Sequence, residues 1–345
     1  MSQRPTIRDV AENAGVSPST VSVVLNDVNG ARVAEETRRR VTDAARRLGY
    51  SADPTARALR TQRTQTIGFV SDAIATTPYA GRIVLGAQEA AWRKGMLMLL
   101  LNTGGDAEHE REAIGALVQR RVDGIVYATW FHRVVEPPRV PGSVPLVLLD
   151  ARPSEPTVSY VVPDENAGAA AAVTELLEAG HRRIGFAQDE DDIPATGERL
   201  RGYRETLEAH GIAFDERLVV RERPGQEGGR RALPRLLDQP DPPTAVFCFN
   251  DRMAMGVYQA AAARGLRIPE DLSVVGFDDQ QEISAAVLPA LTTVALPHYE
   301  MGAWAVEAIF RAPDEEPVEM RMPCPLIRRA SVGPPPAGDG VLAGR

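Results

Sequence analysis

The sequence predicts an N-terminal all-α domain followed by a larger α/β domain of two lobes. Residues 1–50 contain helix start and stop signals and no strand pattern. From Thr66 onward, short β-branched runs alternate with helical segments, which is the pattern of parallel sheets covered by helices. About 270 residues follow that change, too many for one doubly wound sheet of ordinary size. The expected divisions are a helical domain at 1–50, a linking segment at 51–64, the two-lobed domain at 65–333 and a mobile tail at 334–345.

Capping residues place three helices in the first fifty positions. Thr6 followed three residues later by Asp9 can cap the first helix, and Ser17 followed by Pro18 can begin the second. Gly49 provides a C-terminal stop for the third. The expected helices span about 7–14, 18–26 and 34–48.

Helix, tight turn and Ser-capped helix together form the pattern of a helix-turn-helix, whose second helix enters the DNA major groove. The side chains of Ser17, Ser19, Thr20 and Ser22 can offer hydroxyls to bases or phosphates. Residues 1–65 contain eleven arginines and seven acidic residues, a net charge of +4, while the remaining residues carry −12. That excess suits a polyanion at one end of the chain, although a plain three-helix bundle with a solvated surface stays open.

The α/β part alternates regularly between strand and helix patterns. The expected strands are Thr66–Ser71, Met96–Leu101, Gly124–Ala128, Pro145–Leu149, Arg183–Ala187, Ala245–Phe249 and Ser273–Phe277. The expected helices are Gly81–Arg93, His109–Arg120, Asn166–Ala179, Gly197–His210, Arg230–Leu237 and Asp251–Arg264. The stretch at 160–165 is the expected first crossing between the lobes.

Polar residues gather just after the expected strands. They are Asp150, Asn250, Asp251, Asp278 and Asp279. Ligands of parallel α/β sheets bind at the carboxyl ends of strands, and carboxylate and amide groups suit the adjacent hydroxyls of a sugar. The alternative for each aspartate is a helix N-cap, because Asp251 begins an expected helix and Asp278 can cap the turn after its strand.

Several classes of protein are disfavoured. The longest apolar run has six residues, the N-terminus lacks the apolar segment of a secretory signal, and the two cysteines form no CxxC pair, so a cytoplasmic location is expected. No phosphate-binding loop or nucleophile elbow occurs, and the five histidines form no metal-ligand pair. We therefore expect no metal, no cofactor and no enzymatic activity.

The chain resembles the lactose-repressor/galactose-repressor (LacI/GalR) family of bacterial transcription regulators. The matching N-terminal motifs are TIRDVA at 6–11, GVS at 15–17, STVS at 19–22, LN at 25–26, TR at 37–38, LGY at 48–50, ARAL at 56–59 and TIG at 66–68. The later ones are GHRRIG at 180–185, NDRMAMG at 250–256, VGFDD at 275–279 and PALTTV at 289–294. The resemblance extends to about Gly333.

This resemblance implies a homodimer that binds a near-palindromic operator in double-stranded DNA. Residues 53–60 match the family's hinge helix, in which Leu59 is the wedge that kinks the central base step and Ala56 is the small residue beside it. From the residues alone, an ordinary linker remains open for this short segment. DNA contacts are expected from Thr6, Ser17, Pro18, Ser19, Thr20, Ser22, Asn26, Ala56 and Leu59. Val23 and Ala34 depart from the family pattern, which removes one polar base contact and one helix cap.

The remainder resembles the family's periplasmic-binding-protein-like effector domain. The resemblance implies effector contacts from Arg199, Asn250 and Asp278, with Asp150 a weaker match, and it places Tyr79 and Phe247 where aromatic rings often line the pocket. Trp130 is a further aromatic candidate, and a core position is the alternative for Phe247. With Asp251 from the strand-end pattern, the predicted effector site comprises Tyr79, Asp150, Arg199, Phe247, Asn250, Asp251 and Asp278. Ile193 and Ala195 stand where purine-binding members carry a polar pair, so a mono- or oligosaccharide is the expected effector. The expected protein is an allosteric repressor whose effector shifts the lobes and melts the hinge. A sugar-binding protein or carbohydrate-processing enzyme without regulatory output is the alternative.

Overall fold

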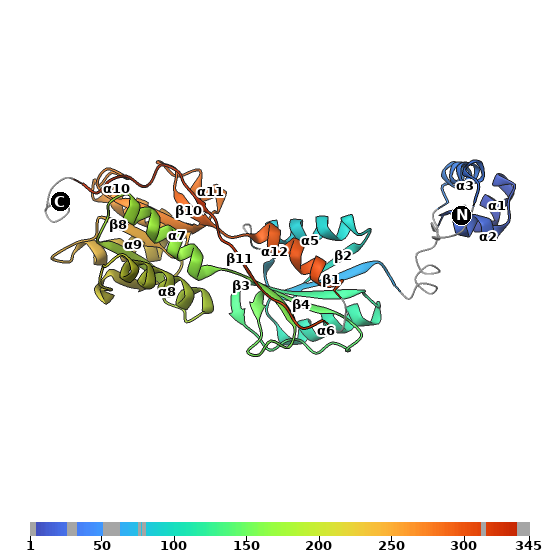
Figure 1. Ribbon diagram of the computed structural model, residues 1–345, viewed down its shortest axis with the longest axis horizontal. Helices are drawn as coiled ribbons and strands as arrows, with labels where there is room; N and C mark the ends of the chain where they lie inside the picture. Colours follow the sequence, from blue (N-terminus) through green and yellow to red (C-terminus); the bar gives the residue numbers. More distant parts are fainter. Residues whose placement is uncertain are drawn as a thin grey trace. The chain divides into compact units, whose positions relative to one another are not determined.

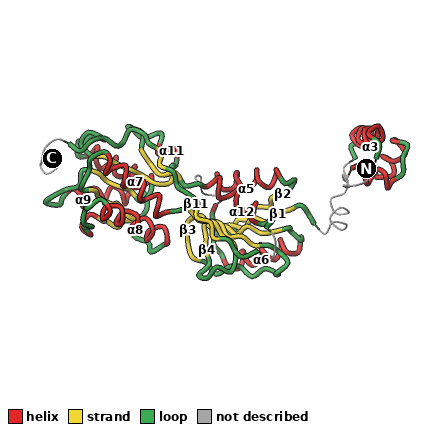
Figure 2. Tube along the Cα trace, viewed as in Figure 1, coloured by secondary structure: helices red, strands yellow, loops and turns green. Residues whose placement is uncertain are grey.

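The computed structural model describes residues 5–25, 33–50, 63–74, 77, 81–311 and 315–336. The chain divides into two compact units, which Figures 1 and 2 show. The first ends at Thr66 and also takes in Arg120–Asp123, and the second comprises Ile67–Gln119 and Gly124–Arg345. This division falls within two residues of the predicted start of the larger domain at residue 65. The first is called the helical unit below and the second the α/β unit.

The helical unit has three described helices around one small core. They are α1 (Ile7–Ala14), α2 (Pro18–Leu25) and α3 (Glu35–Leu48). Its buried side chains come from all three helices: Val10, Ala11, Ala14, Val21, Val24, Val41, Ala44 and Ala45. The spacing of three or four residues between them gives each helix one apolar face, which packs inward. The predicted helix-turn-helix pattern is therefore present as folded structure.

Local caps determine where these helices begin and end. The Thr6 and Asp9 side chains form a reciprocal capping box, and the Ser17 hydroxyl accepts a hydrogen bond from the Thr20 backbone N–H at 3.2 Å. Gly15 and Gly49 terminate α1 and α3 at φ values of 65° and 63°, a left-handed conformation that glycine adopts without a Cβ clash. Ala34 precedes α3 and provides no side-chain cap, as its residue type predicted.

The first lobe of the α/β unit is a six-stranded sheet in the order β11-β5-β4-β3-β1-β2. Its strands are β1 (Thr66–Ser71), β2 (Leu97–Asn102), β3 (Gly124–Val134), β4 (Leu146–Arg152), β5 (Ser159–Pro163) and β11 (Glu319–Met322). Its helices are α5 (Gly81–Arg93), α6 (Ala107–Gln119) and α12 (His298–Ala308). Figure 1 shows α12 beside α5. The two can approach closely because Gly86 and Gly302 present no side chain where the facing backbone passes.

The second lobe is a six-stranded sheet in the order β12-β10-β9-β8-β6-β7. Its strands are β6 (Ile184–Asp189), β7 (Val219–Glu222), β8 (Ala245–Cys248), β9 (Ser273–Asp278), β10 (Thr292–Ala295) and β12 (Leu326–Ile327). Its helices are α7 (Glu165–Glu178), α8 (Pro194–Ala209), α9 (Gln226–Leu237), α10 (Asp251–Ala263), α11 (Gln281–Ser284) and the 3₁₀ turn η3 (Glu216–Leu218). Its core includes Phe247 stacked on Phe186, with ring centroids 4.6 Å apart.

The chain passes between the two sheets three times. The first passage, between β5 and α7, lies where the sequence predicted it, but residues 159–163 form a strand before they leave the first sheet. The other two passages, after β10 and after β11, were not predicted. The strands β7, β10, β11 and β12 have two to four residues each, too few for a clear periodic pattern. Of the predicted tail, 334–336 are described, and 337–345 lie outside the described residues.

Candidate functional site

A cavity of about 110 Å³ lies at the carboxyl ends of strands from both sheets of the α/β unit. The first sheet contributes the middle of β3 and the end of β4, and the second contributes the ends of β6 and β9 and the residues after β8. The lining residues are Trp130, Phe131, His132, Asp150, Pro163, Glu165, Asp189, Asp191, Ile193, Ala195, Arg199, Pro224, Phe249, Asn250, Arg252, Asp278, Leu296 and His298. The sequence predicts the effector site at strand ends, and this cavity is the candidate for it.

Arg199, on α8, is the central charge of this cavity and is only 3% exposed. Its Nε donates a hydrogen bond to Glu165 Oε2 at 2.6 Å, and its Nη2 lies 3.6 Å from Asp278 Oδ1. Nη1 donates to the Phe249 carbonyl oxygen. The guanidinium also lies over the Phe277 ring, 3.6 Å from the centroid. Arg199 is thus held by partners on several elements, so its side chain is presented in a single orientation.

Two carboxylates that the sequence singled out face the cavity. Asp278 ends β9 with a φ of 105°, accepts a hydrogen bond from Gln280 Nε2 at 2.9 Å, and has its pKa raised to about 6 because burial outweighs the attraction of Arg199. Asp150, in β4 with a φ of 54°, is 3% exposed, and its Oδ1 has no hydrogen-bond partner among the described residues. Burial, followed by the charge of Glu165, raises the pKa of Asp150. Positive φ values at two non-glycine residues of one cavity are typical of a functional site.

Asn250 and Asp251 follow the same strand but differ in role. Asn250 lines the cavity, although its Oδ1 accepts from the Met253 backbone N–H at 2.9 Å as the N-cap of α10. Asp251 lies outside the cavity lining, so its role as an effector ligand stays a prediction. Its Oδ2 accepts from the Gln280 backbone N–H at 2.7 Å and its Oδ1 accepts from the Thr293 hydroxyl at 2.6 Å. A carboxylate that is saturated within the fold links α10 to the neighbouring strands instead.

The aromatic candidate Phe247 does not line this cavity. Phe247 is fully buried in the core of the second lobe, in the middle of β8. Phe249, two residues farther toward the carboxyl end, lines the cavity instead. The signal that could have separated the two is position along β8, because Phe247 lies in the middle of that strand and Phe249 lies just past its end at Cys248. Tyr79 lies outside the described residues.

Other lining residues escaped the sequence analysis. Trp130 was a candidate, but its neighbours Phe131 and His132 were not, and neither were the acidic residues Glu165 and Asp189. Ile193 and Ala195 do line the cavity, and both are apolar. The cavity shares Asp278, Leu296 and His298 with an outer cleft of about 840 Å³, so the site continues toward the exposed Arg82 and Glu300.

The second candidate surface lies on the helical unit. Ser17, Pro18 and Ser19 at the start of α2 are exposed, whereas Thr20 and Ser22 are half-buried. The Ser17 hydroxyl lies 2.7 Å from that of Ser19 and 2.9 Å from that of Thr20, which places three hydroxyls together at the helix start. Thr6 is exposed, and its hydroxyl bonds Asp9 at 2.8 Å. Three further predicted DNA contacts, Asn26, Ala56 and Leu59, lie outside the described residues, as does the whole segment 53–60.

Within the described part of the chain, no helix is both long and apolar enough to cross a membrane.

Comparison with known proteins finds close likeness over both units. Residues 6–53 match the family described as "Bacterial regulatory proteins, lacI family", and residues 173–332 match "Periplasmic binding protein-like domain". The ribose operon repressor of Haemophilus influenzae is 33% identical over 89% of this chain and 91% of its own length. The repressor CytR of Escherichia coli K12 is 34% identical over 94% of this chain and 96% of its own.

Two solved structures extend this likeness to the fold of nearly the whole chain. The lac repressor dimer bound to operator and an anti-inducer superposes with a TM-score of 0.75, at 25% identity, over 96% of this chain and all of that one. The complex of the regulator CelR with cellobiose superposes with a TM-score of 0.65, at 32% identity, over 95% of this chain and all of that one.

Proposed function

Since this chain belongs to the lacI family of bacterial regulatory proteins, we propose that it represses transcription under the control of a hydroxyl-rich small molecule, a saccharide, bound in the cavity of its α/β unit. Family membership establishes a DNA-binding transcriptional regulator. The saccharide and the residues that hold it are our proposal. A cytoplasmic location and a role in binding rather than turnover belong to the same proposal.

The observation that supports a saccharide most directly is the set of strand-end groups around Arg199. Asp150 and Asp278 offer carboxylate acceptors, and the Asn250 amide lies in the same lining. Sugar hydroxyls both donate and accept hydrogen bonds, and carboxylates and guanidinium groups provide both complements. Aromatic side chains complete the lining at Trp130 and Phe249, which suits the apolar face of a sugar ring. The CelR structure contains cellobiose, a saccharide.

A purine is the alternative effector, because the family that this chain resembles includes purine-binding members. Ile193 and Ala195 argue against it, since their apolar side chains in the cavity provide no hydrogen bonds to a base. The saccharide therefore remains the proposed class.

On the DNA side, we propose a homodimer that binds a near-palindromic operator. The exposed hydroxyls of Ser17 and Ser19 would face bases or phosphates, together with Thr20, Ser22, Pro18, Thr6 and Asn26. Leu59 and Ala56 of the proposed hinge helix would enter the central minor groove. Saccharide binding would shift the population toward a lobe arrangement that the hinge helices do not tolerate, and about 1.4 kcal/mol of coupling suffices for a tenfold loss of operator affinity.

Operator binding with and without saccharides tests this proposal. Genomic fragments retained by the purified full-length chain provide the operator, and fluorescence anisotropy follows its release by individual mono- and disaccharides. We expect Asp278→Ala to leave operator affinity intact and to weaken saccharide binding roughly tenfold to a hundredfold, the loss of one charged hydrogen bond. Asp241→Ala is the matched control, because Asp241 lies outside the cavity lining and its side chain is 80% exposed.

Two results would contradict the proposal in different ways. Equal retention of random DNA and genomic fragments would contradict sequence-specific operator binding. Release by a purine and by no saccharide would overturn the saccharide and leave the regulator in place.

A further inference from the structure

Strand β3 contains a bulge in the stretch that lines the cavity. Ala128 of β3 pairs with Leu149 of β4, and Arg133 of β3 pairs with Ala151 of β4. An advance of five residues along β3 therefore matches an advance of two residues along β4. The extra residues leave the ladder and are re-aimed, as bulges beside active sites commonly do. We call residues 129–132 the β3 bulge. Three of its four side chains, Trp130, Phe131 and His132, line the cavity.

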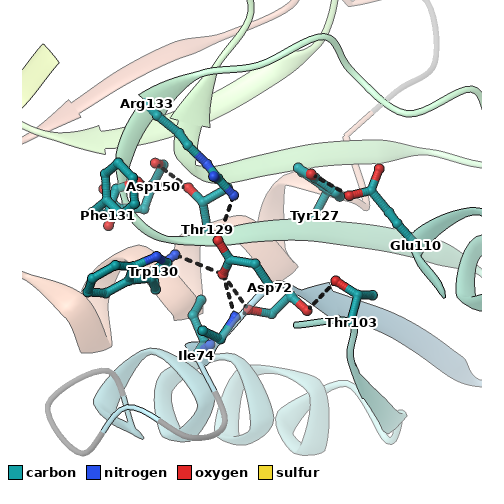
Figure 3. Close-up of polar contacts among 12 residues, drawn as sticks. Asp72, Ile74, Thr103, Glu110, Tyr127, Thr129, Trp130, Phe131, Arg133 and Asp150 are labelled. Atoms are coloured by element: carbon teal, nitrogen blue, oxygen red, sulfur yellow. Dashed lines mark hydrogen bonds and ion pairs between the residues drawn. The ribbon is translucent and has the colours of Figure 1, made fainter. Parts of the chain in front are cut away.

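The β3 bulge is fastened at both ends by buried polar contacts, which Figure 3 shows. The Thr129 hydroxyl donates to the Asp150 carbonyl oxygen at 2.7 Å, which ties the bulge to β4. Asp72, just after β1, accepts from the Trp130 backbone N–H at 3.1 Å and pairs with the Arg133 guanidinium at 2.5 Å. The Asp72 side chain is only 9% exposed, whereas that of Arg133 is 33% exposed, so the carboxylate is the buried partner of this pair. A segment held in this way presents its side chains in fixed positions.

The side chains of the β3 bulge offer an aromatic surface and one neutral polar group. The Trp130 and Phe131 rings meet edge to face with centroids 4.9 Å apart. His132 is 2% exposed, and neither ring nitrogen has a hydrogen-bond partner among the described residues. Burial, with the nearby charges of Arg152, Arg321 and Arg199, lowers the pKa of His132 to about 3. Its imidazole is therefore neutral near pH 7, with one donor and one acceptor nitrogen.

The charged residues around the cavity limit which ligands can bind next to the β3 bulge. Five acidic residues line the cavity, at Asp150, Glu165, Asp189, Asp191 and Asp278, against two arginines, Arg199 and Arg252. Glu165 and Asp278 already lie against Arg199. A phosphate or carboxylate on the ligand would lie among these acidic side chains, with the buried cation Arg199 already engaged by Glu165 and Asp278.

We propose that the β3 bulge is the specificity-determining wall of the site and selects an uncharged, ring-form saccharide. Trp130 and Phe131 contact the apolar face of the sugar ring, and the two nitrogens of His132 are available to a ring hydroxyl. Asp72 is a positioning residue that holds this wall without touching the ligand. The inference rests on the proposed function, because it refines which saccharide the same cavity binds.

Calorimetry on the full-length protein tests the selected class with five probes: D-ribose, D-glucose, cellobiose, the acyclic polyol sorbitol and glucose 6-phosphate. We expect at least one of the three uncharged ring sugars to bind, and sorbitol and glucose 6-phosphate to bind at least tenfold more weakly. Preference for the phosphate or the acyclic polyol would overturn the proposal while leaving an effector site. Failure of all five probes to bind would remove both this inference and the proposed function.

Variants of the wall then test its residues with the best-binding ring sugar. Trp130→Ala and His132→Phe should each weaken its binding about tenfold or more, and Asp278→Ala, which alters the opposite wall, should do so as well. Wild-type affinity in both bulge variants, with loss in Asp278→Ala, would overturn the wall assignment and leave the proposed function standing. Operator binding without sugar reports that each variant is folded.

Tryptophan fluorescence and the preference among ligands distinguish a positioning role of Asp72 from a role in stability alone. The chain has three tryptophans. Trp130→Phe should abolish the emission change that the sugar causes, whereas Trp92→Phe, on an exposed residue of α5, should retain it. Asp72→Ala should shift the emission attributed to Trp130 and reduce the preference for ring sugar over sorbitol. Asp72→Asn should have smaller effects on both, because its amide oxygen still accepts a hydrogen bond. Unchanged emission and unchanged preference in Asp72→Ala would refute its positioning role.

Discussion

The helical unit and the cavity of the α/β unit place their functional groups in opposite environments. At the start of α2, the hydroxyls of Ser17 and Ser19 are exposed, and the unit buries only apolar side chains among its core residues. In the cavity, Arg199, Glu165 and Asp150 are all nearly inaccessible to water. One site is therefore a solvated surface on a small apolar core, whereas the other contains buried charges whose desolvation cost the surrounding fold must offset.

The same contrast appears in how far apart along the chain the contributing residues lie. The proposed DNA contacts among the described residues of the helical unit are Thr6 at the start of α1 and five residues at the turn before α2 and on α2 itself. The cavity draws on β3, β4, α7, α8, β9 and the residues after β8. A local site tolerates changes in its side chains without loss of the fold, while a cavity built from distant elements links ligand binding to the stability of both lobes.

Salt should separate the two sites most strongly. If the dimer neutralises roughly 6 to 10 phosphates, raising salt from about 50 to about 200 mM should lower operator affinity about 10³- to 10⁵-fold, because bound counterions are released on association. Saccharide affinity should change little, since an uncharged ligand releases no counterions. Anisotropy and calorimetry across the same salt series measure the two effects. An equal dependence of operator affinity and saccharide affinity on salt would contradict this difference between the two sites.

Removal of the central cation should damage the cavity more than any single change in the helical unit. Arg199→Ala leaves Glu165 and Asp278 buried without their shared partner, which costs about 3–5 kcal/mol in other buried ion pairs. The α/β unit should therefore unfold at a clearly lower denaturant concentration. Arg204→Ala is the control, because that guanidinium pairs with Glu208 on the exposed face of the same helix. Equal midpoints for the two variants would show that the buried pair adds nothing.

The pH dependence of stability should reveal the carboxyl at Asp278. Its folded pKa of about 6 lies above the ordinary value of 3.8, so the folded protein retains a proton that the unfolded chain has lost. The stabilisation from this group is complete below about pH 4 and is lost as the pH rises through 6. Asp278→Asn lacks this loss, so its unfolding free energy should gain up to about 3 kcal/mol relative to wild type between about pH 4 and 7. Denaturant titrations without ligand at several pH values measure the difference, and a constant difference would contradict the raised pKa.

The smallest expected effect lies at the uncapped helix of the helical unit. Ala34→Ser should stabilise that unit by about 1 kcal/mol, because a serine hydroxyl can accept from the first-turn N–H groups of α3 that Ala34 leaves without a side-chain partner. Hydrogen exchange of α3 amides in the full chain measures the gain. Ala262→Ser, at an exposed position within α10, is the matched control and should give no such protection. Faster exchange in the Ala34→Ser variant would show that the cap geometry does not form.

Much of the fold follows from short stretches of sequence. The capping box at Thr6, the terminating glycines and the apolar runs of the central strands act within a few residues, so local pattern predicts them. The general place of the site also follows, since Asp150, Asn250 and Asp278 come directly after apolar strands. Short edge strands such as β11 and β12 do not follow, because their few residues carry too little pattern and depend on the sheet they join.

Only the tertiary structure decided what the polar groups of the site face. In the sequence, Asn250 and Asp251 are adjacent strand-end residues that are equally good candidates for the site. In the structure, Asn250 lines the cavity, whereas Asp251 accepts hydrogen bonds from the Thr293 hydroxyl and the Gln280 backbone N–H. The β3 bulge was equally hidden, because its shape depends on Asp72, more than fifty residues away along the chain. Helix caps and strand runs arise from interactions between near neighbours, whereas the direction of a buried side chain is set by packing and hydrogen bonds between distant segments, which no local pattern records.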